Sequence, residues 1–167
     1  NSGGVHSLKY GLTTNNVLGV EMVTIEGEIL RVGGKGLDQT GYDLLGIITG
    51  SEGLLGIVTE VTVRILRKPE TARALLLGFN SSEEGGKCVA AIIAAGIIPG
   101  GLEMMDAPAI KATEDFVHAG YPLDVEALLL VELDGPQVEV DYLIERVGNI
   151  AKDFSAVYSR ISESEEE

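Results

Sequence analysis

The sequence has very few of the residues that build disulfides and metal sites. It contains one cysteine, Cys88, and two histidines, His6 and His118, among 167 residues. A single cysteine excludes an internal disulfide bond and suits a reducing compartment. Cys88 lies in an apolar periodic stretch with no base nearby, which is typical of a buried core thiol. Because the two histidines are isolated from each other and from the single cysteine, we expect no metal site.

Basic residues and long apolar runs are also scarce. Lys and Arg number 12 against 26 Asp and Glu, which gives a formal net charge of −14. Such an acidic surface repels phosphate backbones, so we expect no nucleic acid partner. The most apolar run, residues 89–98, is broken by Gly96 and is too short to cross a bilayer, and no signal peptide is visible. We therefore expect a protein that is not integral to the membrane.

Glycine, by contrast, is abundant, and its distribution divides the chain. The 22 glycines point to tight turns and to close approaches of the backbone. Residues 1–68 alternate glycine-rich loops with β-patterned segments, whereas residues 69–167 alternate strands with helices. Because the chain opens inside a glycine motif and stops in an acidic run, we expect it to be a piece of a longer protein.

In the first part, the pattern predicts a β-hairpin and one further strand. Residues 17–25 and 28–32 predict the hairpin strands, with a turn at Glu26 and Gly27. Residues 42–48 predict a short helix. Residues 57–66 predict the clearest strand, whose alternate apolar side chains share one face while a more polar face meets solvent.

In the second part, the pattern predicts an α+β unit. Strands are predicted over residues 74–79, 101–105, 127–133 and 155–161, and helices over residues 82–95, 107–118 and 137–154. Ser81 with Glu84 matches a capping box, and Asp106 can cap the second helix. The order of the elements indicates a ferredoxin-like split βαβ unit with one extra helix.

Glycine clusters are the candidates for cofactor binding. Residues 1–4 could turn backbone amides into an anion-binding nest, although a plain turn has the same pattern. Residues 49–56 have glycine at every third position, as in a Rossmann phosphate loop, but they lead into a strand and not a helix. Residues 33–36 lack the Ser or Thr of a P-loop and are interpreted as a hairpin exit. A cofactor held here would therefore be bound through backbone groups.

Several motifs occur together along the chain: residues 1–4, 9–11, 50–61, 98–106 and 118–122. Jointly they resemble the FAD-linked oxidases of the vanillyl-alcohol oxidase and p-cresol methylhydroxylase (PCMH) superfamily. Within that superfamily, they are similar to the FAD subunits of glycolate oxidase and to the D-lactate dehydrogenases. The resemblance implies the second subdomain of a PCMH-type FAD-binding domain over residues 1–68. It implies part of a ferredoxin-like cap domain over residues 69–167.

The resemblance also implies which residues bind FAD. It places the turn at residues 1–4 at the FAD pyrophosphate. It places the loop at residues 50–53 and the start of the following strand, residues 56–58, along the cofactor. The residues implied are Asn1, Ser2, Gly3, Gly4, Gly50, Ser51, Glu52, Gly53, Gly56, Ile57 and Val58. We expect the two bends to share one groove.

The activity that the resemblance implies is oxidation of a small 2-hydroxy acid, glycolate or D-lactate. A hydride passes to the flavin while a base takes the hydroxyl proton, and electrons leave to an iron–sulfur subunit or the respiratory chain. In the family, the residues that bind the substrate and, in some members, a metal lie in the part of the cap that follows the segment matching this chain. Another phosphate-binding loop lies in the subdomain that precedes it. We therefore assign no catalytic residue, and we expect this chain alone to be inactive and to bind FAD weakly or not at all.

Other residues have both a structural and a functional interpretation. Glu103 lies on a short strand whose alternate face could direct it into a flavin pocket or into solvent. His6 could lie near the flavin edge, and Lys9 could pair with phosphate, but both patterns are common on surfaces. His118 near a helix end favours a structural role. Met104 and Met105 are interpreted as core residues.

A ligand-sensing module without catalytic activity is the alternative to an enzyme. The βαββαβ order of the second part is also that of small regulatory domains, and a fold alone does not decide function. A third possibility, a purely structural interaction domain, would require exposed apolar patches that pair chains. A sensor would not need the glycine bends of the first part, so those bends favour the enzyme.

Overall fold

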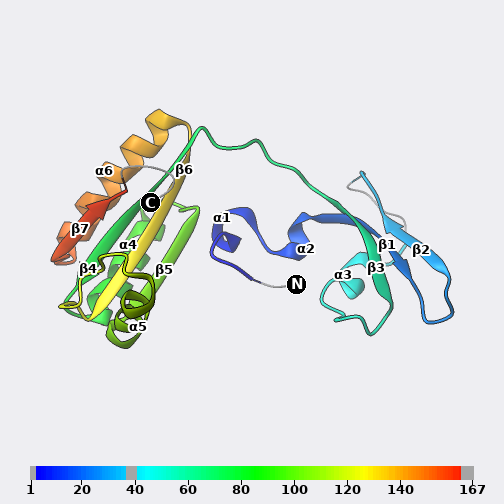
Figure 1. The fold of residues 1–167 in the computed structure, drawn as a ribbon. Helices are drawn as coiled ribbons and strands as arrows, with labels where there is room; N and C mark the ends of the chain where they lie inside the picture. The colour runs from blue at the N-terminus through cyan, green and yellow to red at the C-terminus, as the bar shows by residue number, and fades with distance from the viewer. Residues whose placement is uncertain (1–2, 37–40, 163–167) are drawn as a thin grey trace. The chain divides into compact units, whose positions relative to one another are not determined.

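The computed structural model describes residues 3–36 and 41–162, which form two compact units, Asn1–Arg67 and Lys68–Glu167. Both units combine helices with antiparallel sheets, so the α+β class is confirmed (Figure 1). No helix in the described part of the chain is long and apolar enough to cross a membrane.

The first unit is built on a three-stranded antiparallel sheet of order β2-β1-β3. Its elements are α1 (Ser7–Tyr10), α2 (Thr13–Asn16), β1 (Val17–Val23), β2 (Ile29–Gly33), α3 (Leu44–Ile48) and β3 (Ile57–Val63). The core is small because one short helix covers the sheet: it consists of Val20, Met22, Val32, Leu45 and Ile48. The predicted hairpin is confirmed by the antiparallel pairing of β1 with β2. The predicted helix is confirmed as α3, where the Asp43 side chain accepts a hydrogen bond from Gly46 N at 2.8 Å.

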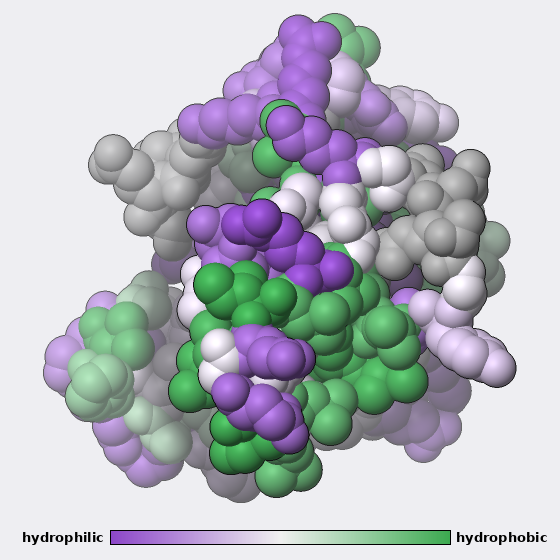
Figure 2. All heavy atoms as spheres, turned by 90° about the vertical axis from the view of Figure 1, so that its right-hand side faces the viewer, coloured by the Kyte–Doolittle hydropathy of each residue, from purple (hydrophilic) through white to green (hydrophobic). Residues whose placement is uncertain are grey.

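The strand β3 differs from the prediction in the exposure of its apolar face. All residues of β3 except Thr62 are exposed, so its apolar face is not buried within the described residues. The physical reason is that no described helix covers this strand: α3 packs against β1 and β2. Figure 2, which turns the right-hand side of Figure 1 toward the viewer, shows hydrophobic side chains gathered on the surface. Exposed apolar residues of the unit include Ile57, Val58, Val61 and Val63.

The second unit has a four-stranded antiparallel sheet of order β5-β6-β4-β7. Its elements are β4 (Thr71–Phe79), α4 (Ser82–Ala94), β5 (Gly101–Asp106), α5 (Ala107–Val117), β6 (Ala127–Gly135), α6 (Gln137–Asp153) and β7 (Tyr158–Ile161). This order is that of a ferredoxin-like split βαβ unit, with α5 as the extra helix, so the prediction is confirmed.

The two faces of this sheet are covered differently. On one face, α4 and α6 pack over alternate residues of β4 and β6 in a large core that includes Leu75, Leu77, Leu129 and Val131. The opposite face carries a smaller cluster in which Ile110 of α5 meets Leu76, Val125 and Leu128. The main core thus lies between the sheet and two helices, and the other face is only partly covered.

Local capping explains where the helices begin. The Ser81 hydroxyl accepts from Glu83 N at 3.2 Å and starts α4, while Asp106 accepts from Ala109 N at 3.0 Å and starts α5. The reciprocal half of the predicted capping box is replaced by an ion pair, since the Glu84 carboxylate lies 3.3 Å from Lys87 Nζ.

Candidate functional site

A cavity of about 410 Å³ opens beside the first glycine motif. It is lined by backbone and side chains of Gly3, Gly4, Val5, His6, Ser7, Tyr10, Gly11, Leu12, Thr13, Asn16, Val17 and Val63. The short helices α1 and α2 form much of this wall. They were not predicted from the sequence because four residues are too few to show a helical period.

The glycines of this motif present bare backbone. A Cβ at either Gly3 or Gly4 would meet no atom within 4 Å, so packing among the described residues does not require glycine at either position. The Gly4 amide donates to Ser7 Oγ at 2.9 Å, and Ser7 N donates to Gly4 O at 2.9 Å. Asn1 and Ser2, the other predicted residues of this motif, lie outside the described residues.

The second predicted loop is a tight, exposed bend. Gly50, Glu52 and Gly53 have left-handed φ values of 87°, 53° and 81°. Ser51 N donates to Ile48 O, and Leu54 N donates to Ser51 O, both at 3.0 Å. A Cβ at Gly53 would meet nothing within 4 Å. The bend is therefore shaped by its own backbone hydrogen bonds and by residues in left-handed conformations, which glycine adopts without steric cost.

Gly56 has a different reason to be glycine. Its φ is 151°, and a Cβ there would overlap the Met22 methyl group and lie 2.5 Å from Val23 O. The residue is therefore required by the close approach of the chain to β1. Ile57 and Val58, which follow it, are 72% and 42% exposed and could contact a ligand.

The two predicted bends do not line one cavity. None of the residues from 50 to 58 belongs to the wall beside Gly3 and Gly4, which reaches β3 only at Val63. Ile57 begins β3 and Val63 ends it, so the two contacts lie roughly 20 Å apart along the strand. Only a long, extended ligand could touch both segments.

The other candidates of the first unit cluster on α1. The His6 and Tyr10 rings meet edge to face with centroids 6.4 Å apart, and Lys9 Nζ lies 5.6 Å from the centre of the Tyr10 ring. His6 lines the cavity, whereas Lys9 does not. Hence His6 is placed to meet a ligand beside Gly3, and Lys9 is placed on the Tyr10 ring.

In the second unit, most of the remaining candidates have structural roles. Cys88 is fully buried, and burial raises the pKa of its thiol to about 11, which excludes a reactive thiolate. His118 is the left-handed cap of α5, with φ 56° and ψ 46°. Met105 packs against the smaller cluster, but the prediction of a core role is wrong for Met104, which is 47% exposed because it lies on an edge strand.

Glu103 lies on the face of the sheet away from α4 and α6. It is exposed and pairs with Leu130, which pairs with Leu76, which in turn pairs with Arg160. Directly opposed residues of antiparallel strands point to the same face. Glu103 and Arg160 therefore stand at the two ends of one cross-strand row. Arg160 was not singled out from the sequence, because only the strand register places it there.

No metal centre is formed by the described residues: among residues 3–36 and 41–162, no three His, Cys, Asp or Glu side chains are grouped to hold an ion.

Comparison with known sequences gives one family. A family model described as FAD linked oxidases, C-terminal domain, matches residues 68–167. The whole chain is 54% identical to the glycolate oxidase subunit GlcD of Escherichia coli (strain K12) and 44% identical to GlcD of Bacillus subtilis (strain 168). A D-lactate dehydrogenase of Archaeoglobus fulgidus is 37% identical over 68% of the chain. The chain covers 34%, 36% and 26% of these three proteins, so it spans about a third of the length of its curated relatives.

Solved structures with the same fold include an alkyldihydroxyacetonephosphate synthase and a p-cresol methylhydroxylase with substrate bound. The first covers 98% of this chain with a TM-score of 0.79 at 20% identity, and the match spans 32% of that protein. The second covers 89% with a TM-score of 0.66 at 18% identity, over 34% of that protein. At these identities the likeness concerns the fold, which extends over both units of the chain.

Proposed function

This chain belongs to the FAD-linked oxidases, and we propose that it is part of a flavin-dependent oxidoreductase that oxidises a small 2-hydroxy acid, glycolate or D-lactate. The observation that carries the proposal is the 54% identity over the whole chain to a glycolate oxidase subunit. The match includes the glycine bends of the first unit as well as the second unit. By itself, this third of a longer protein is inactive.

We assign the first 68 residues to the FAD-binding domain and residues 69–167 to the cap. The division of the chain into units after Arg67 supports this assignment, as does the family match that begins at residue 68. The apolar surface of β3 supports it too. Exposed contiguous apolar surface marks an interface, and in this proposal another part of the FAD-binding domain covers it.

FAD would be held by backbone groups at both bends of the first unit. The residues proposed are Asn1, Ser2, Gly3 and Gly4 at the first bend, Gly50, Ser51, Glu52 and Gly53 at the second, and then Gly56, Ile57 and Val58. The described members fit a cofactor, since Gly3, Gly4 and Gly53 present open backbone and Ile57 is exposed. An extended dinucleotide suits their separation along β3. When bound, FAD supplies the hydride acceptor, while the chain supplies position.

A second subunit would take the electrons. The Escherichia coli relative is named as a subunit of glycolate oxidase, which supports a multi-subunit assembly here, with an iron–sulfur protein as the electron acceptor. We place the longer protein in the cytoplasm or at the periphery of the inner membrane. The single, buried cysteine supports a reducing compartment.

The alternative is a ligand-sensing module without catalysis. The ferredoxin-like strand order of the second unit is the observation that favours it. A sensor gives no role to the open glycine bends of the first unit, however. The enzyme accounts for both units and is therefore preferred.

Flavin reduction in the longer protein tests the proposed function. The protein is purified with its bound FAD, and D-lactate or glycolate is added without oxygen. We expect the flavin absorbance band to bleach with at least one acid and to persist with L-lactate, which has the opposite configuration. Persistence of the band with both substrates would contradict the proposal.

The chain alone provides a second test. After incubation with FAD and desalting, the 167-residue chain is expected to lose its yellow colour, because in this proposal another part of the FAD-binding domain forms the second wall of the cofactor site. Stoichiometric retention of FAD would show that the two bends suffice, and would overturn the expectation that a further segment is required.

A further inference from the structure

The side chain of Asn16 joins three separate points of the first unit. Its Nδ2 donates to Tyr10 O and to Leu12 O, both at 2.9 Å, and its Oδ1 accepts from Arg64 Nη2 at 3.0 Å. Arg64 N also donates to Asn16 O at 2.8 Å. Tyr10 is the last residue of α1, and Arg64 directly follows β3. Asn16 therefore links the segment that carries the first glycine motif to the sheet.

The partners of Asn16 match an amide and not a carboxylate. An asparagine side chain has two N–H donors and one carbonyl oxygen. Here the two donors face backbone carbonyls, while the oxygen faces a guanidinium. A carboxylate at position 16 would put oxygen against oxygen at Tyr10 and Leu12, and an alanine would remove the donors. The hydrogen bonds therefore account for an asparagine at this position.

Burial in a core does not fix the segment that Asn16 holds. Neither α1 nor α2 contains a buried residue, and Val5, Leu8 and Leu12 are exposed. Segments with few buried apolar contacts open locally at a low cost in free energy. The position of α1 and α2 therefore depends more on hydrogen bonds, and the Asn16 side chain that makes three of them is half-buried.

A series of hydrogen bonds leads from Asn16 to the first glycine motif. Gly4 N donates to Ser7 Oγ, and Ser7 N donates to Gly4 O, both at 2.9 Å. Gly11 N donates to Ser7 O at 3.0 Å across the single turn of α1. Because Asn16 holds the Tyr10 carbonyl at the end of this turn, it sets where Gly4 lies relative to the sheet.

Arg64 connects Asn16 to the second proposed cofactor segment. It directly follows β3, the strand that begins at Ile57 after Gly56. The pairing of β3 with β1 makes this strand part of the sheet. The two hydrogen bonds between Asn16 and Arg64 therefore fix the spacing between the two proposed cofactor segments.

We propose that Asn16 is a positioning residue of the cofactor site, which holds the turn at Gly3 and Gly4 at a set distance from the start of β3. It acts through the carbonyls of Tyr10 and Leu12. A backbone that is already arranged for a ligand binds it more tightly, because less ordering is needed on binding. The positioning itself rests on the hydrogen bonds, whereas its effect on FAD rests on the proposed function.

The arrangement is tested on the 167-residue chain by NMR. Asn16→Asp replaces both donors with oxygen. Asn15→Asp is the matched control, because it adds the same charge one residue earlier and keeps its bond, in which Asn15 Oδ1 accepts from Leu12 N at 2.8 Å. We expect the amide resonances of Gly4 and Ser7 to shift in Asn16→Asp and to keep their positions in Asn15→Asp. Unchanged resonances in Asn16→Asp, or equal shifts in both variants, would overturn the proposal.

The affinity for FAD is measured on the longer protein after its flavin has been removed. Asn16→Asp is expected to raise the Kd of FAD roughly 10- to 100-fold, because contacts between oxygens replace two hydrogen bonds. Asn16→Ala removes the donors without adding charge and is expected to raise the Kd roughly 3- to 10-fold, so it serves where Asn16→Asp does not fold. Asn15→Asp is expected to leave the Kd unchanged. An unchanged Kd in Asn16→Ala contradicts the positioning role.

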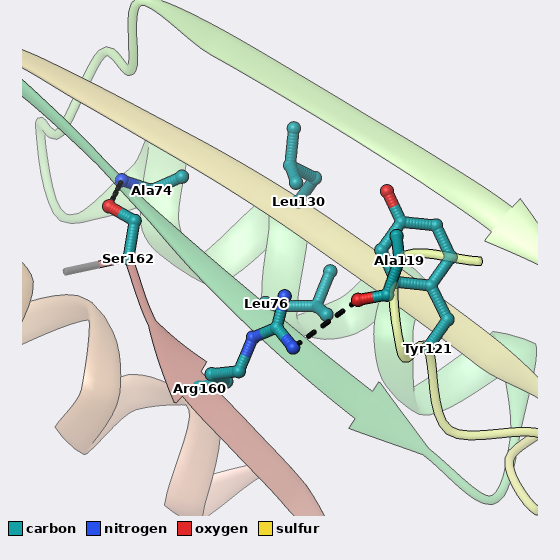
Figure 3. Close-up of a pocket in the computed structure, with 7 residues that line it drawn as sticks. All are labelled: Ala74, Leu76, Ala119, Tyr121, Leu130, Arg160 and Ser162. Atoms are coloured by element: carbon teal, nitrogen blue, oxygen red, sulfur yellow. Dashed lines mark hydrogen bonds between the residues drawn. The ribbon is translucent and has the colours of Figure 1, made fainter. Parts of the chain in front are cut away.

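A control in the second unit separates positioning from stability. Ser162 Oγ accepts from Ala74 N at 3.0 Å (Figure 3), so Ser162→Ala also removes a hydrogen bond between a side chain and the backbone. Ser162→Ala is expected to lower the free energy of unfolding while the Kd of FAD and the visible circular dichroism of the bound flavin stay the same. Asn16→Ala is expected to change all three. If it lowers only the free energy of unfolding, its role is merely structural and the proposal fails.

Failure of the proposed function gives a different result. If the unaltered longer protein binds no FAD, the assignment to a flavin enzyme is wrong, and the NMR comparison of Asn16→Asp with Asn15→Asp still decides whether Asn16 positions the turn. If the unaltered protein and the Asn16 variants bind FAD equally well, the proposed function stands and the positioning role is overturned.

Discussion

At the scale of single residues, the Glu114 carboxylate orders the loop after α5, because it accepts hydrogen bonds from Gly120 N and Tyr121 N. The hydrogen bond from Tyr121 N, helped by that from Gly120 N and by the charge of His118, lowers the pKa of the Glu114 carboxyl below its ordinary value of 4.5. A lowered pKa in the folded state means that the ionised form stabilises the fold. That stabilisation is fully present above the ordinary pKa and is lost as pH falls through the lowered one.

We predict that Glu114→Ala lowers the free energy of unfolding at neutral pH, because two backbone amides lose their acceptor. The difference from the unaltered chain should shrink as pH falls below 4.5, where the carboxylate begins to be protonated. Urea unfolding at a series of pH values measures this. Asp115→Asn is the control on the same helix, since Asp115 pairs with exposed Lys111 at 2.8 Å and not with a described loop amide. A pH-independent difference would contradict the prediction.

At the scale of elements, α4 contains an adjacent pair of glycines in different surroundings. A Cβ at Gly85 would lie 3.3 Å from Met104 Sδ and 3.5 Å from the Phe79 ring, whereas a Cβ at Gly86 would meet nothing within 4 Å. Neither glycine has a positive φ. Close packing therefore explains why glycine occupies position 85, but it does not explain the glycine at position 86.

We predict that Gly86→Ala raises the free energy of unfolding of the second unit by about 0.5–1 kcal/mol, because alanine restricts the unfolded chain and suits a helix interior. Gly85→Ala, the matched variant, should gain less or lose stability, since Met104 must move. Urea unfolding followed by circular dichroism compares the two. A larger gain from Gly85→Ala than from Gly86→Ala would argue against this account of the packing.

The elements were more predictable than the site. Caps at Ser81 and Asp106 and the turn at Gly27 act over three or four residues, so the sequence alone indicates them. The four-residue helices α1 and α2 carry no period and were missed. Arg160 was missed for a different reason: its neighbours Leu76 and Ala119 are far away in the sequence. The pairing of β7 with β4 brings Leu76 close, and the hydrogen bond to the Ala119 carbonyl in a loop brings Ala119 close.

At the scale of the whole molecule, the two units differ in how much apolar surface they bury. The main core of the second unit joins 14 buried residues, whereas the core of the first unit has five. Hydrophobic burial is the main favourable contribution to folding. The second unit should therefore be the more stable one.

We predict that hydrogen exchange of the intact chain is slowest in β4 and β6 and clearly faster in β1 and β3, although β1 is also a central strand. The reason is that local opening of the first unit exposes little apolar surface and so costs less free energy. Mass spectrometry of exchanged peptides gives the comparison. Equal protection of β1 and β4 would contradict this difference between the cores.

The pairing of β4 with β7 has a consequence for how the second unit can be connected. The strand that opens the unit lies beside the one that closes it, and Ala74 N donates to Ser162 Oγ at 3.0 Å while Arg73 Nη2 donates to Ser162 O at 2.8 Å. Adjacent ends are the condition under which a domain tolerates insertion into a host chain or circular permutation. A short peptide could join the two ends, and the chain could be opened in a loop to create new termini, without unpairing any strand of the sheet.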